Sequence, residues 1–336
     1  MKSIKSLINL FYGITKYILT RQNNEASYQA FVKIYSITNG LSSYLFNLGY
    51  KVIDKINLFK KKKIKSEKFL NYSKNEIIIT DKIDNILSSI KKESYYKFNY
   101  IIDEKICNNI LNHIENIKGY ANKDLDKTIN LKNNKNDISY VNFQEKELLK
   151  SEELQQLAIN NVFLKVCRNY FGTEPILSNI GVAVSYPSNK PSGDYAQLYH
   201  FDLDRIKWLK FFVYLTDVNE NDGPHCYIEG THKVFSKPYK LIKKGYKRIN
   251  DDEIFSYFDK KKERKLTGKK GTIFVGDSSA FHKGLNPKEN LRVMLSIEYC
   301  NSLFGAKVDK VPIDNLEKIN ISKDEFKTYK LFSRFI

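Results

Sequence analysis

Hydrophobic and polar residues follow two different rhythms along the chain, and the change falls near Pro175. In residues 1–58, apolar side chains such as Ile4, Leu7 and Phe11 recur every three or four positions, which predicts helices. After Pro175, short apolar runs are separated by turn-forming glycine, proline and asparagine residues, which is typical of β-strands. The sequence therefore predicts helices first and a β-rich core second.

Between these two parts, the pattern predicts helices that alternate with short strands. Strands are expected over residues 75–79 and 96–102, with a helix over 81–92 between them. Asp81 is the expected N-cap of that helix, and Asp103 is the expected N-cap of the next one, because a carboxylate can accept from free backbone N–H groups.

Two longer segments follow before the β-rich part begins. Residues 119–137 are rich in Asn, Lys and Asp, which predicts a loop and makes the segment a candidate lid over a pocket. Apolar residues at helical spacing return over 147–170, which predicts one helix that ends at Gly172.

The β-rich part contains several short apolar runs. Strands are expected over residues 180–186, 208–215, 225–229, 272–275 and 291–299. These short strands with intervening turns predict an α+β fold with a double-stranded β-helix core, a cupin-like jelly roll, with the N-terminal helices packed around it. Residues 235–270 are basic and partly helical, and we expect them to form an external insertion.

The candidate chemistry begins at Tyr199–Asp202, where an imidazole and a carboxylate stand two residues apart. Side chains at i and i+2 of a strand point to the same face, so His200 and Asp202 can reach one metal ion. His282 offers a second imidazole, and Arg292 follows ten residues later. Two histidines and one carboxylate form the facial triad of non-haem Fe(II) oxygenases, and a guanidinium grips a carboxylate with two parallel hydrogen bonds.

Four segments in one order give the chain a resemblance to a known family. They are Gln197–Asp202, Gly223–Lys233, Gly271–Asp277 and Phe281–Gly284 with Arg292. Through these segments, residues 197–300 resemble the phytanoyl-CoA dioxygenase family of Fe(II)- and 2-oxoglutarate-dependent oxygenases. A looser resemblance extends upstream to about Tyr100.

The resemblance implies a cofactor set and a role for each site residue. His200, Asp202 and His282 would bind Fe(II). Arg292 would hold the far carboxylate of 2-oxoglutarate, and Gln197 would hydrogen-bond the co-substrate or the substrate. O2 is the other implied co-substrate, and ascorbate is an implied stimulant. Related halogenases replace the carboxylate ligand by a small residue, so Asp202 points to hydroxylation of an unactivated C–H bond, with decarboxylation of 2-oxoglutarate to succinate.

The substrate is less constrained than the metal. The resemblance places Lys210 near the pocket, and His225 stands where many relatives have an apolar residue, so both are candidate substrate contacts. The family acts on lipids, sugars and secondary metabolites, and fold-level analogy does not choose among these small molecules. His232 is expected to be a hydrogen-bonded structural residue, and Trp208 a core residue.

Charge is concentrated in two segments of a basic chain. Lys and Arg number 56 against 38 Asp and Glu, which gives a formal net charge of +18 and favours acidic partners. Residues 1–100 carry 18 basic and 7 acidic side chains, and residues 237–270 carry 13 and 5. If the second segment faces the pocket, it favours an anionic substrate. The basic run Lys60–Lys65 lacks interleaved aromatic residues, so we expect a solvated linker and no nucleic-acid partner.

Cysteine usage and the N-terminal segment bear on the compartment. The four cysteines are scattered without C-x-x-C spacing, which predicts reduced thiols in a cytoplasmic protein. Residues 6–20 are largely apolar but too short to span a membrane, and Lys16 interrupts them. We expect a docking helix there, with membrane contact at most peripheral through this segment.

The expected organisation has three parts. Residues 1–95 form a helical extension with a basic linker, residues 96–305 form the jelly-roll domain with its insertion at 235–270, and residues 306–336 form a helical tail. One alternative function is a non-catalytic jelly roll that binds a metal or a sugar, against which Arg292 argues. A membrane or nucleic-acid binder driven by the net charge is a further alternative.

Overall fold

The chain is described here from a computed structural model. It describes residues 2–20, 23–55, 79–133, 138–188, 191–243, 245–312, 319 and 323–336. The linker predicted at Lys60–Lys65 and nearly all of the strand predicted over 75–79 lie outside these residues.

The larger of two sheets is antiparallel at every pairing and has the strand order β1-β9-β6-β11-β5-β4-β2-β3. Its strands are β1 (Tyr95–Ile101), β2 (Gly119–Ala121), β3 (Thr128–Ile129), β4 (Tyr140–Phe143), β5 (Ile176–Ser185), β6 (Trp208–Tyr214), β9 (Thr272–Gly276) and β11 (Arg292–Cys300). Strands β6 and β11 lie at its centre, as their nearly continuous burial requires.

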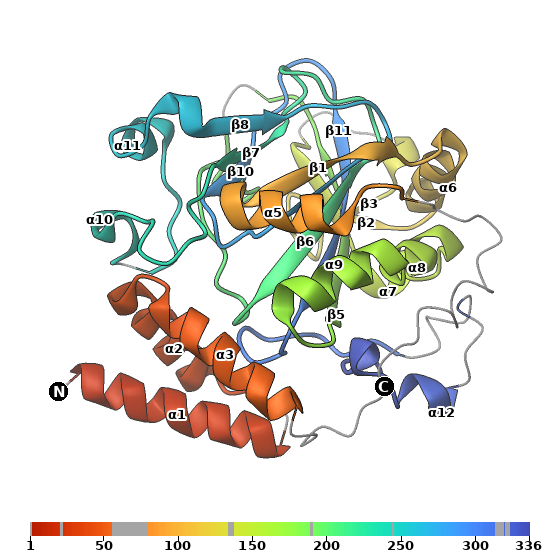
Figure 1. Cartoon of the computed structure of the whole chain (residues 1–336). Helices are drawn as coiled ribbons and strands as arrows, with labels where there is room; N and C mark the ends of the chain where they lie inside the picture. Colours follow the sequence, from red (N-terminus) through yellow and green to blue (C-terminus); the bar gives the residue numbers. More distant parts are fainter. Residues whose placement is uncertain are drawn as a thin grey trace.

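Alternate residues of β6 enter two different hydrophobic clusters. Leu209, Phe211 and Val213 belong to the main core, which includes the helices α5 (Ile83–Glu93) and α9 (Asn161–Phe171). These helices lie across one face of the large sheet (Figure 1), and Phe163 of α9 stacks on Phe211 with ring centroids 4.1 Å apart. The remaining face of β6 turns toward the second sheet, because side chains alternate along a strand.

The smaller sheet has the order β10-β7-β8. Its strands are β7 (His225–Ile228), β8 (Glu263–Leu266) and β10 (His282–Gly284). Isolated bridges extend it, because His200 pairs with His282 and Tyr199 pairs with Ile249. A hydrophobic cluster with members from both sheets joins them. The predicted α+β fold with a jelly-roll core is therefore confirmed.

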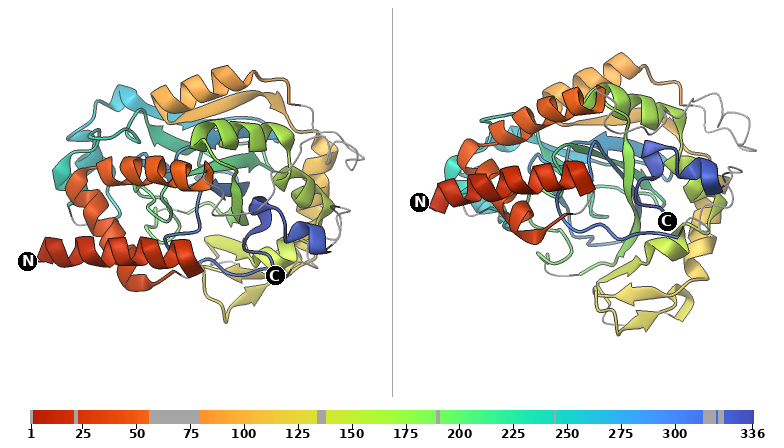
Figure 2. Two further views of the ribbon diagram at one scale, coloured as in Figure 1. Left: turned by 60° about the horizontal axis from the view of Figure 1, so that its bottom comes forward. Right: turned by 90° about the horizontal axis from the view of Figure 1, so that it is seen from below.

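Three N-terminal helices lie together along one side of the molecule (Figures 1 and 2). They are α1 (Lys2–Thr20), α2 (Glu25–Thr38) and α3 (Leu41–Lys55). The hydroxyl of Tyr17 in α1 accepts a hydrogen bond from the backbone N–H of Leu303 at 2.9 Å, and Tyr35 of α2 stacks on Phe201 at 6.1 Å. Helix α2 thus supports the segment between the two predicted ligands His200 and Asp202.

The prediction of a single helix over residues 147–170 is wrong. The chain forms α7 (Glu145–Leu148), α8 (Glu152–Ala158) and α9 instead. The side chains of Ser151 and Asn160 accept hydrogen bonds from N–H groups of the following turn, so each caps a new helix where the apolar pattern alone suggests continuity. The predicted end at Gly172 is confirmed, with a left-handed φ of 71°.

The loop predicted over 119–137 is also wrong in part, since it contains β2, β3 and the short helix η1 (Leu131–Asn133). The side chain of Asn122 accepts hydrogen bonds from the N–H groups of Ser139 and Tyr140 at 3.1 and 3.2 Å. Here the polar residues serve a turn at the edge of the sheet.

Asp81 does not cap a helix, because its carboxylate accepts from the N–H of Asn99 at 2.9 Å and from the hydroxyl of Tyr96 at 2.8 Å. Helix α5 begins after Lys82 without a side-chain cap. The other predicted cap is confirmed. Asp103 accepts from the N–H of Lys105 at 2.7 Å, at the start of α6 (Glu104–Glu115).

The segment 235–270 is not purely an external insertion. It contains α10 (Tyr239–Ile242), α11 (Asp251–Phe255) and η2 (Lys260–Lys262), but it also supplies β8 and Ile249 to the smaller sheet. Its buried apolar residues are the reason, because Leu241, Ile242 and Ile254 pack in one cluster with Phe201. Because most of the segment is basic, the sequence did not indicate that these three apolar residues are buried.

The chain ends in α12 (Lys323–Phe326) and η4 (Lys330–Phe332), where Arg334 forms an ion pair with Glu145. All four cysteines are buried and unpaired. Among the helices that the structure describes, none combines the length and apolarity needed to cross a membrane.

Candidate metal and co-substrate site

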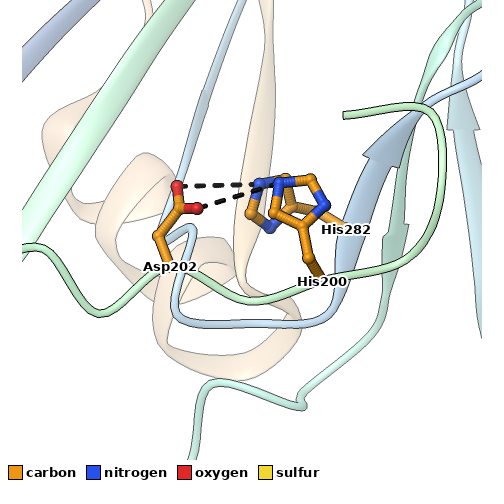
Figure 3. Close-up of side chains that lie close together, drawn as sticks. All are labelled: His200, Asp202 and His282. Atoms are coloured by element: carbon orange, nitrogen blue, oxygen red, sulfur yellow. Dashed lines mark ion pairs between the residues drawn. The ribbon is translucent and has the colours of Figure 1, made fainter. Parts of the chain in front are cut away.

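The three predicted metal ligands meet in one buried cluster (Figure 3). His200 Nε2 lies 3.8 Å from Asp202 Oδ1, and His282 Nε2 lies 3.7 Å from Asp202 Oδ2. One donor atom from each residue falls within 4.8 Å of the others. His282 lies in β10, His200 bridges directly to it, and Asp202 follows His200 by two residues, so the fold brings together residues that are 80 and 82 positions apart in sequence.

Backbone carbonyls hold both imidazoles in the tautomer that a metal requires. His200 Nδ1 lies 2.9 Å from the carbonyl oxygen of Leu198, and His282 Nδ1 lies 2.9 Å from that of Ala280. A carbonyl only accepts, so each Nδ1 carries the hydrogen and each Nε2 presents a lone pair. Burial lowers the pKa of both histidines, which keeps them neutral.

The two histidines also fix each other through the backbone. The N–H of His200 donates to the carbonyl oxygen of His282 at 3.0 Å, and the reverse bond is 2.8 Å. The N–H of Asp202 donates to the carbonyl oxygen of Ser278 at 2.8 Å. Backbone hydrogen bonds therefore hold the donor set in place, and two imidazoles with one carboxylate suit Fe(II).

Lys210 of β6 holds the carboxylate of the triad. Its Nζ lies 2.7 Å from Asp202 Oδ2 and 3.3 Å from Glu298 Oε2. Glu298 is the cross-strand partner of Lys210 on the neighbouring strand β11. Burial opposes ionisation of Asp202, but the Lys210 ammonium holds its pKa well below the usual range. The ammonium that the sequence places near a substrate is thus engaged by two carboxylates.

Arg292 is 3% exposed at the start of β11. Its Nη1 donates to the carbonyl oxygen of Gly223, its Nη2 lies 3.2 Å from Ser185 Oγ, and its Nε has no partner among the described residues. No carboxylate of the described chain pairs with it, and burial lowers its pKa. A buried guanidinium without a counter-charge needs an anionic ligand, because the isolated charge is costly.

Strand register shows what lies beside this arginine. Ser185 of β5 is the Cα partner of both Arg292 and Tyr140, so the three residues form a row across β11, β5 and β4. At Gly284 a Cβ atom would come within 2.9 Å of Arg292 Nη2, so a side chain there would have to displace the guanidinium. Gly284 is two residues after His282, which places the arginine near the triad.

Other buried polar atoms around the triad lack partners. Both ring nitrogens of His225, the hydroxyl of Tyr227 and Nε2 of Gln197 have none among the described residues. The His225 ring lies 5.5 Å from the His282 ring, and the Tyr227 ring lies 5.7 Å from it. Buried polar groups rarely remain unpaired, so these atoms fit a chamber that receives polar ligands.

The sequence did not identify three residues that lie near the triad or Arg292, namely Tyr227, Ser185 and Tyr140. A signal existed for Tyr227, because it stands two residues after His225 in a strand and so points to the same face. No pattern marked Ser185 or Tyr140, whose proximity to Arg292 follows from strand register alone.

Two predicted structural residues behave as expected. His232 Nδ1 lies 2.9 Å from Ser94 Oγ, and burial lowers its pKa to about 4, so it is a neutral structural group. Trp208 is buried and donates its indole N–H to Ser278 Oγ at 2.6 Å.

A pocket of about 740 Å³ adjoins the site. Its lining includes Gln197 and two neighbours of the ligands, Leu198 and Lys283, but none of the three ligand side chains. Lys283 follows His282 in β10 and therefore faces the opposite side of the sheet. This pocket therefore lies beside the triad, and the three candidate ligands do not line it.

Comparisons with known proteins agree with this geometry. Residues 97–287 match the model of a family described as phytanoyl-CoA dioxygenase, and the match includes His200, Asp202 and His282 but ends before Arg292. No curated protein sequence matches the chain.

Solved structures resemble the chain at low sequence identity. HygX from Streptomyces hygroscopicus, with nickel and 2-oxoglutarate bound, is 13% identical over 68% of this chain and 90% of its own, with a TM-score of 0.48. SnoN, a non-haem α-ketoglutarate-dependent epimerase from nogalamycin biosynthesis, is 12% identical over 65% and 82%, with a TM-score of 0.44. AviO1 from Streptomyces viridochromogenes Tue57 is 9% identical over 66% and 96%, with a TM-score of 0.42. These likenesses say nothing about the substrate of this chain.

Proposed function

Because the chain belongs to the phytanoyl-CoA dioxygenase family, we propose that it is an Fe(II)- and 2-oxoglutarate-dependent hydroxylase of a small molecule. The observation that carries the proposal is the buried His200–Asp202–His282 cluster, which presents two neutral Nε2 donors and one carboxylate to a single point. These three residues are the proposed Fe(II) ligands. The tautomers and the backbone bridge between the histidines prepare them for the metal.

Arg292 is the proposed anchor for the far carboxylate of 2-oxoglutarate. Its support is a buried guanidinium that no described carboxylate neutralises, with the hydroxyl of Ser185 3.2 Å from Nη2. Gln197 is the second proposed contact, since its Nε2 is buried and unpaired while its Oε1 accepts from the N–H of Ser192 at 2.6 Å. That hydrogen bond occupies the amide oxygen and leaves Nε2 as a donor for a ligand.

When bound, iron with 2-oxoglutarate and O2 supplies the oxidation of a C–H bond, while 2-oxoglutarate loses CO2 to become succinate. The chain's own task is to orient these molecules and exclude bulk water. Asp202 occupies the ligand position that a halide would need, so hydroxylation is the proposed outcome. Lys210 keeps this carboxylate oriented, and His225 and Tyr227 offer unpaired polar atoms to the substrate.

Succinate formation from 2-oxoglutarate tests the proposal without knowledge of the substrate. We expect wild-type protein with Fe(II) and O2 to form succinate slowly, and His200→Ala and His282→Ala to reduce the rate at least a hundredfold. His113→Ala is the matched control, because this histidine lies on α6, where its Nε2 is 2.8 Å from the carbonyl oxygen of Glu147 on α7. Equal rates in wild type and triad variants would contradict the proposal. Metal binding without succinate formation would favour the non-catalytic jelly roll.

A further inference from the structure

Residues 246–250 run beside the first candidate metal ligand and are joined to its segment by an isolated bridge between Ile249 and Tyr199. Tyr199 and Ile249 exchange both backbone hydrogen bonds, with N–O distances of 2.9 and 2.8 Å. In an antiparallel pair the next residues on each side stand opposite each other and point to one face. Arg248 is therefore opposite His200, and its side chain points to the same side as the His200 ring, toward Asp202.

Tyr246 and Arg248 lie over this ligand. The Tyr246 ring meets the His200 ring edge to face, with centroids 6.1 Å apart. The guanidinium carbon of Arg248 lies 5.1 Å from the centroid of the Tyr246 ring. A guanidinium stacked on a ring keeps its N–H groups free in the plane of the stack, where they can bind an anion.

Arg248 is a cation without a counter-ion in the part of the chain that the structure describes. Its Nη1 is buried and has no hydrogen-bond partner there. The adjacent Lys247 differs, because its Nζ lies 2.6 Å from Glu253 Oε1. Arginine stays protonated, so the buried Nη1 of Arg248 can donate to an acceptor on a ligand.

A second cation stands close by. Lys123 donates to the carbonyl oxygen of Asp194, and its Nζ lies 5.7 Å from the centroid of the Tyr140 ring. Partial burial and the Arg248 charge lower the pKa of Lys123, and Asp194 opposes them. The ring of Tyr140 stacks on that of Tyr195, with centroids 5.0 Å apart and planes 2° from parallel.

Tyr140 connects this group of residues to Arg292, the proposed co-substrate anchor. Tyr140 stands in the row that contains Ser185 and Arg292. We name the set of Lys123, Tyr140, Tyr195, Tyr246 and Arg248 the rim cluster. It extends from His200 to the Arg292 row and offers two cations and three aromatic rings.

We propose that the rim cluster binds an oxyanion of the substrate, a phosphate or carboxylate group, through Arg248 and Lys123. The tyrosine rings then contact the adjoining ring or apolar part. This inference rests on the proposed function, because it assigns the substrate of the same site. The guanidinium can give an oxyanion two parallel hydrogen bonds and the ammonium adds a point charge, whereas a neutral sugar or lipid would bring no charge to match Arg248.

Titration calorimetry with phenyl phosphate tests the inference on metal-free full-length protein. We expect Arg248→Gln and Lys123→Gln each to weaken binding about tenfold or more, and Arg248→Lys to weaken it less than Arg248→Gln. Lys243→Gln is the control, because it removes an exposed cation from the same segment and should leave binding unchanged. Benzyl alcohol, the neutral probe, should bind wild type and Arg248→Gln alike.

Equal affinity of wild type and Arg248→Gln for phenyl phosphate would overturn the inference, and so would absence of binding to wild type. The visible band that 2-oxoglutarate forms with Fe(II) is recorded in parallel on wild type. A band without an Arg248 effect refutes the rim site and leaves the proposed function standing. An Arg248 effect without a band refutes the proposed function and leaves an anion site.

Discussion

At the scale of single residues, the metal site depends on which nitrogen of each imidazole carries its hydrogen. The carbonyl oxygens of Leu198 and Ala280 take the Nδ1 hydrogens of His200 and His282 at 2.9 Å. Both acceptors belong to the backbone, so they persist in any variant that folds. The ligand geometry is then limited by Asp202, whose orientation depends on a side chain.

That side chain is Lys210, and its replacement should loosen the metal site. Lys210→Met removes the ammonium 2.7 Å from Asp202 Oδ2, so we expect Fe(II) affinity to fall about 10–100-fold, with part of it restored in Lys210→Arg. Anaerobic metal titration measures this. Lys265→Met, which breaks the exposed pair with Glu220, should bind Fe(II) as wild type does. Unchanged affinity in Lys210→Met would exclude the positioning role.

Lys237 is a second buried ammonium, and it has no carboxylate partner among the described residues. It contacts the hydroxyl of Tyr35 at 3.1 Å and the rings of Phe201 and Phe281 at 5.5 and 5.9 Å. Burial lowers its pKa from 10.5 to about 7. Between these two values the unfolded chain binds more protons than the folded one, so this group makes the protein more stable as pH rises from 7.

We therefore expect Lys237→Met to stabilise the protein at pH 7, with a benefit that shrinks by about 2 kcal/mol between pH 7 and pH 9. Urea unfolding of both proteins at the two pH values measures the difference, in which the titration of other groups cancels. A difference that does not change with pH would show that Lys237 keeps its ordinary pKa in the folded state.

At the scale of elements, strand β10 connects the proposed metal ligand His282 to the proposed co-substrate anchor Arg292. Gly284 follows His282 by two residues, and the absence of a side chain there makes room for Arg292 at the start of β11. A Cβ atom at Gly284 would come within 2.9 and 3.1 Å of the two terminal nitrogens of the guanidinium.

Gly284→Ala should therefore displace the arginine and spare the triad. We expect the dissociation constant for 2-oxoglutarate to rise about tenfold, the equivalent of one lost hydrogen bond to a charged group, with Fe(II) affinity unchanged. Gly49→Ala is the control, since nothing lies within 4 Å of the added atom. Equal loss of Fe(II) and 2-oxoglutarate binding would indicate general damage to the hairpin.

The helices and strands that could be predicted from the sequence are those in which the order of apolar and polar residues shows which side chains are buried. The strands around β6 and β11 were predicted because their apolar runs are buried on both faces. The single helix predicted over 147–170 was wrong because Ser151 and Asn160 each cap a new helix. An apolar stripe does not show where a side chain accepts a hydrogen bond from a backbone N–H. Strand β8 (Glu263–Leu266) was missed because three of its four residues are charged and only Leu266 is buried.

The candidate site could be predicted to the same extent. Spacing and family resemblance led to His200, Asp202, His282 and Arg292, and the structure brings the first three together and buries the fourth. Arg248 was not predicted, because its place opposite His200 depends on the bridge between Tyr199 and Ile249, which joins segments 50 residues apart. Long-range register of this kind leaves no local signal.

At the scale of the whole molecule, two sheets meet near the triad, where several buried polar atoms have no hydrogen-bond partner among the described residues. The family match over residues 97–287 covers the ligands, and the three N-terminal helices support the ligand segment from outside through Tyr35 and Phe201. The cofactors predicted from the sequence, Fe(II) and 2-oxoglutarate, are those of the family to which the chain belongs. The central claim is that the triad and Arg292 bind them together.

The measurement that tests this claim most directly is an anaerobic titration of Fe(II)-loaded protein with 2-oxoglutarate, followed by the visible charge-transfer band of the chelate. We predict a band in wild type and a dissociation constant raised at least tenfold in Arg292→Ala, because a charge-assisted contact is lost. Lys243→Gln should match wild type. Absence of the band from folded, iron-loaded wild type would contradict the account, and so would equal affinity in Arg292→Ala.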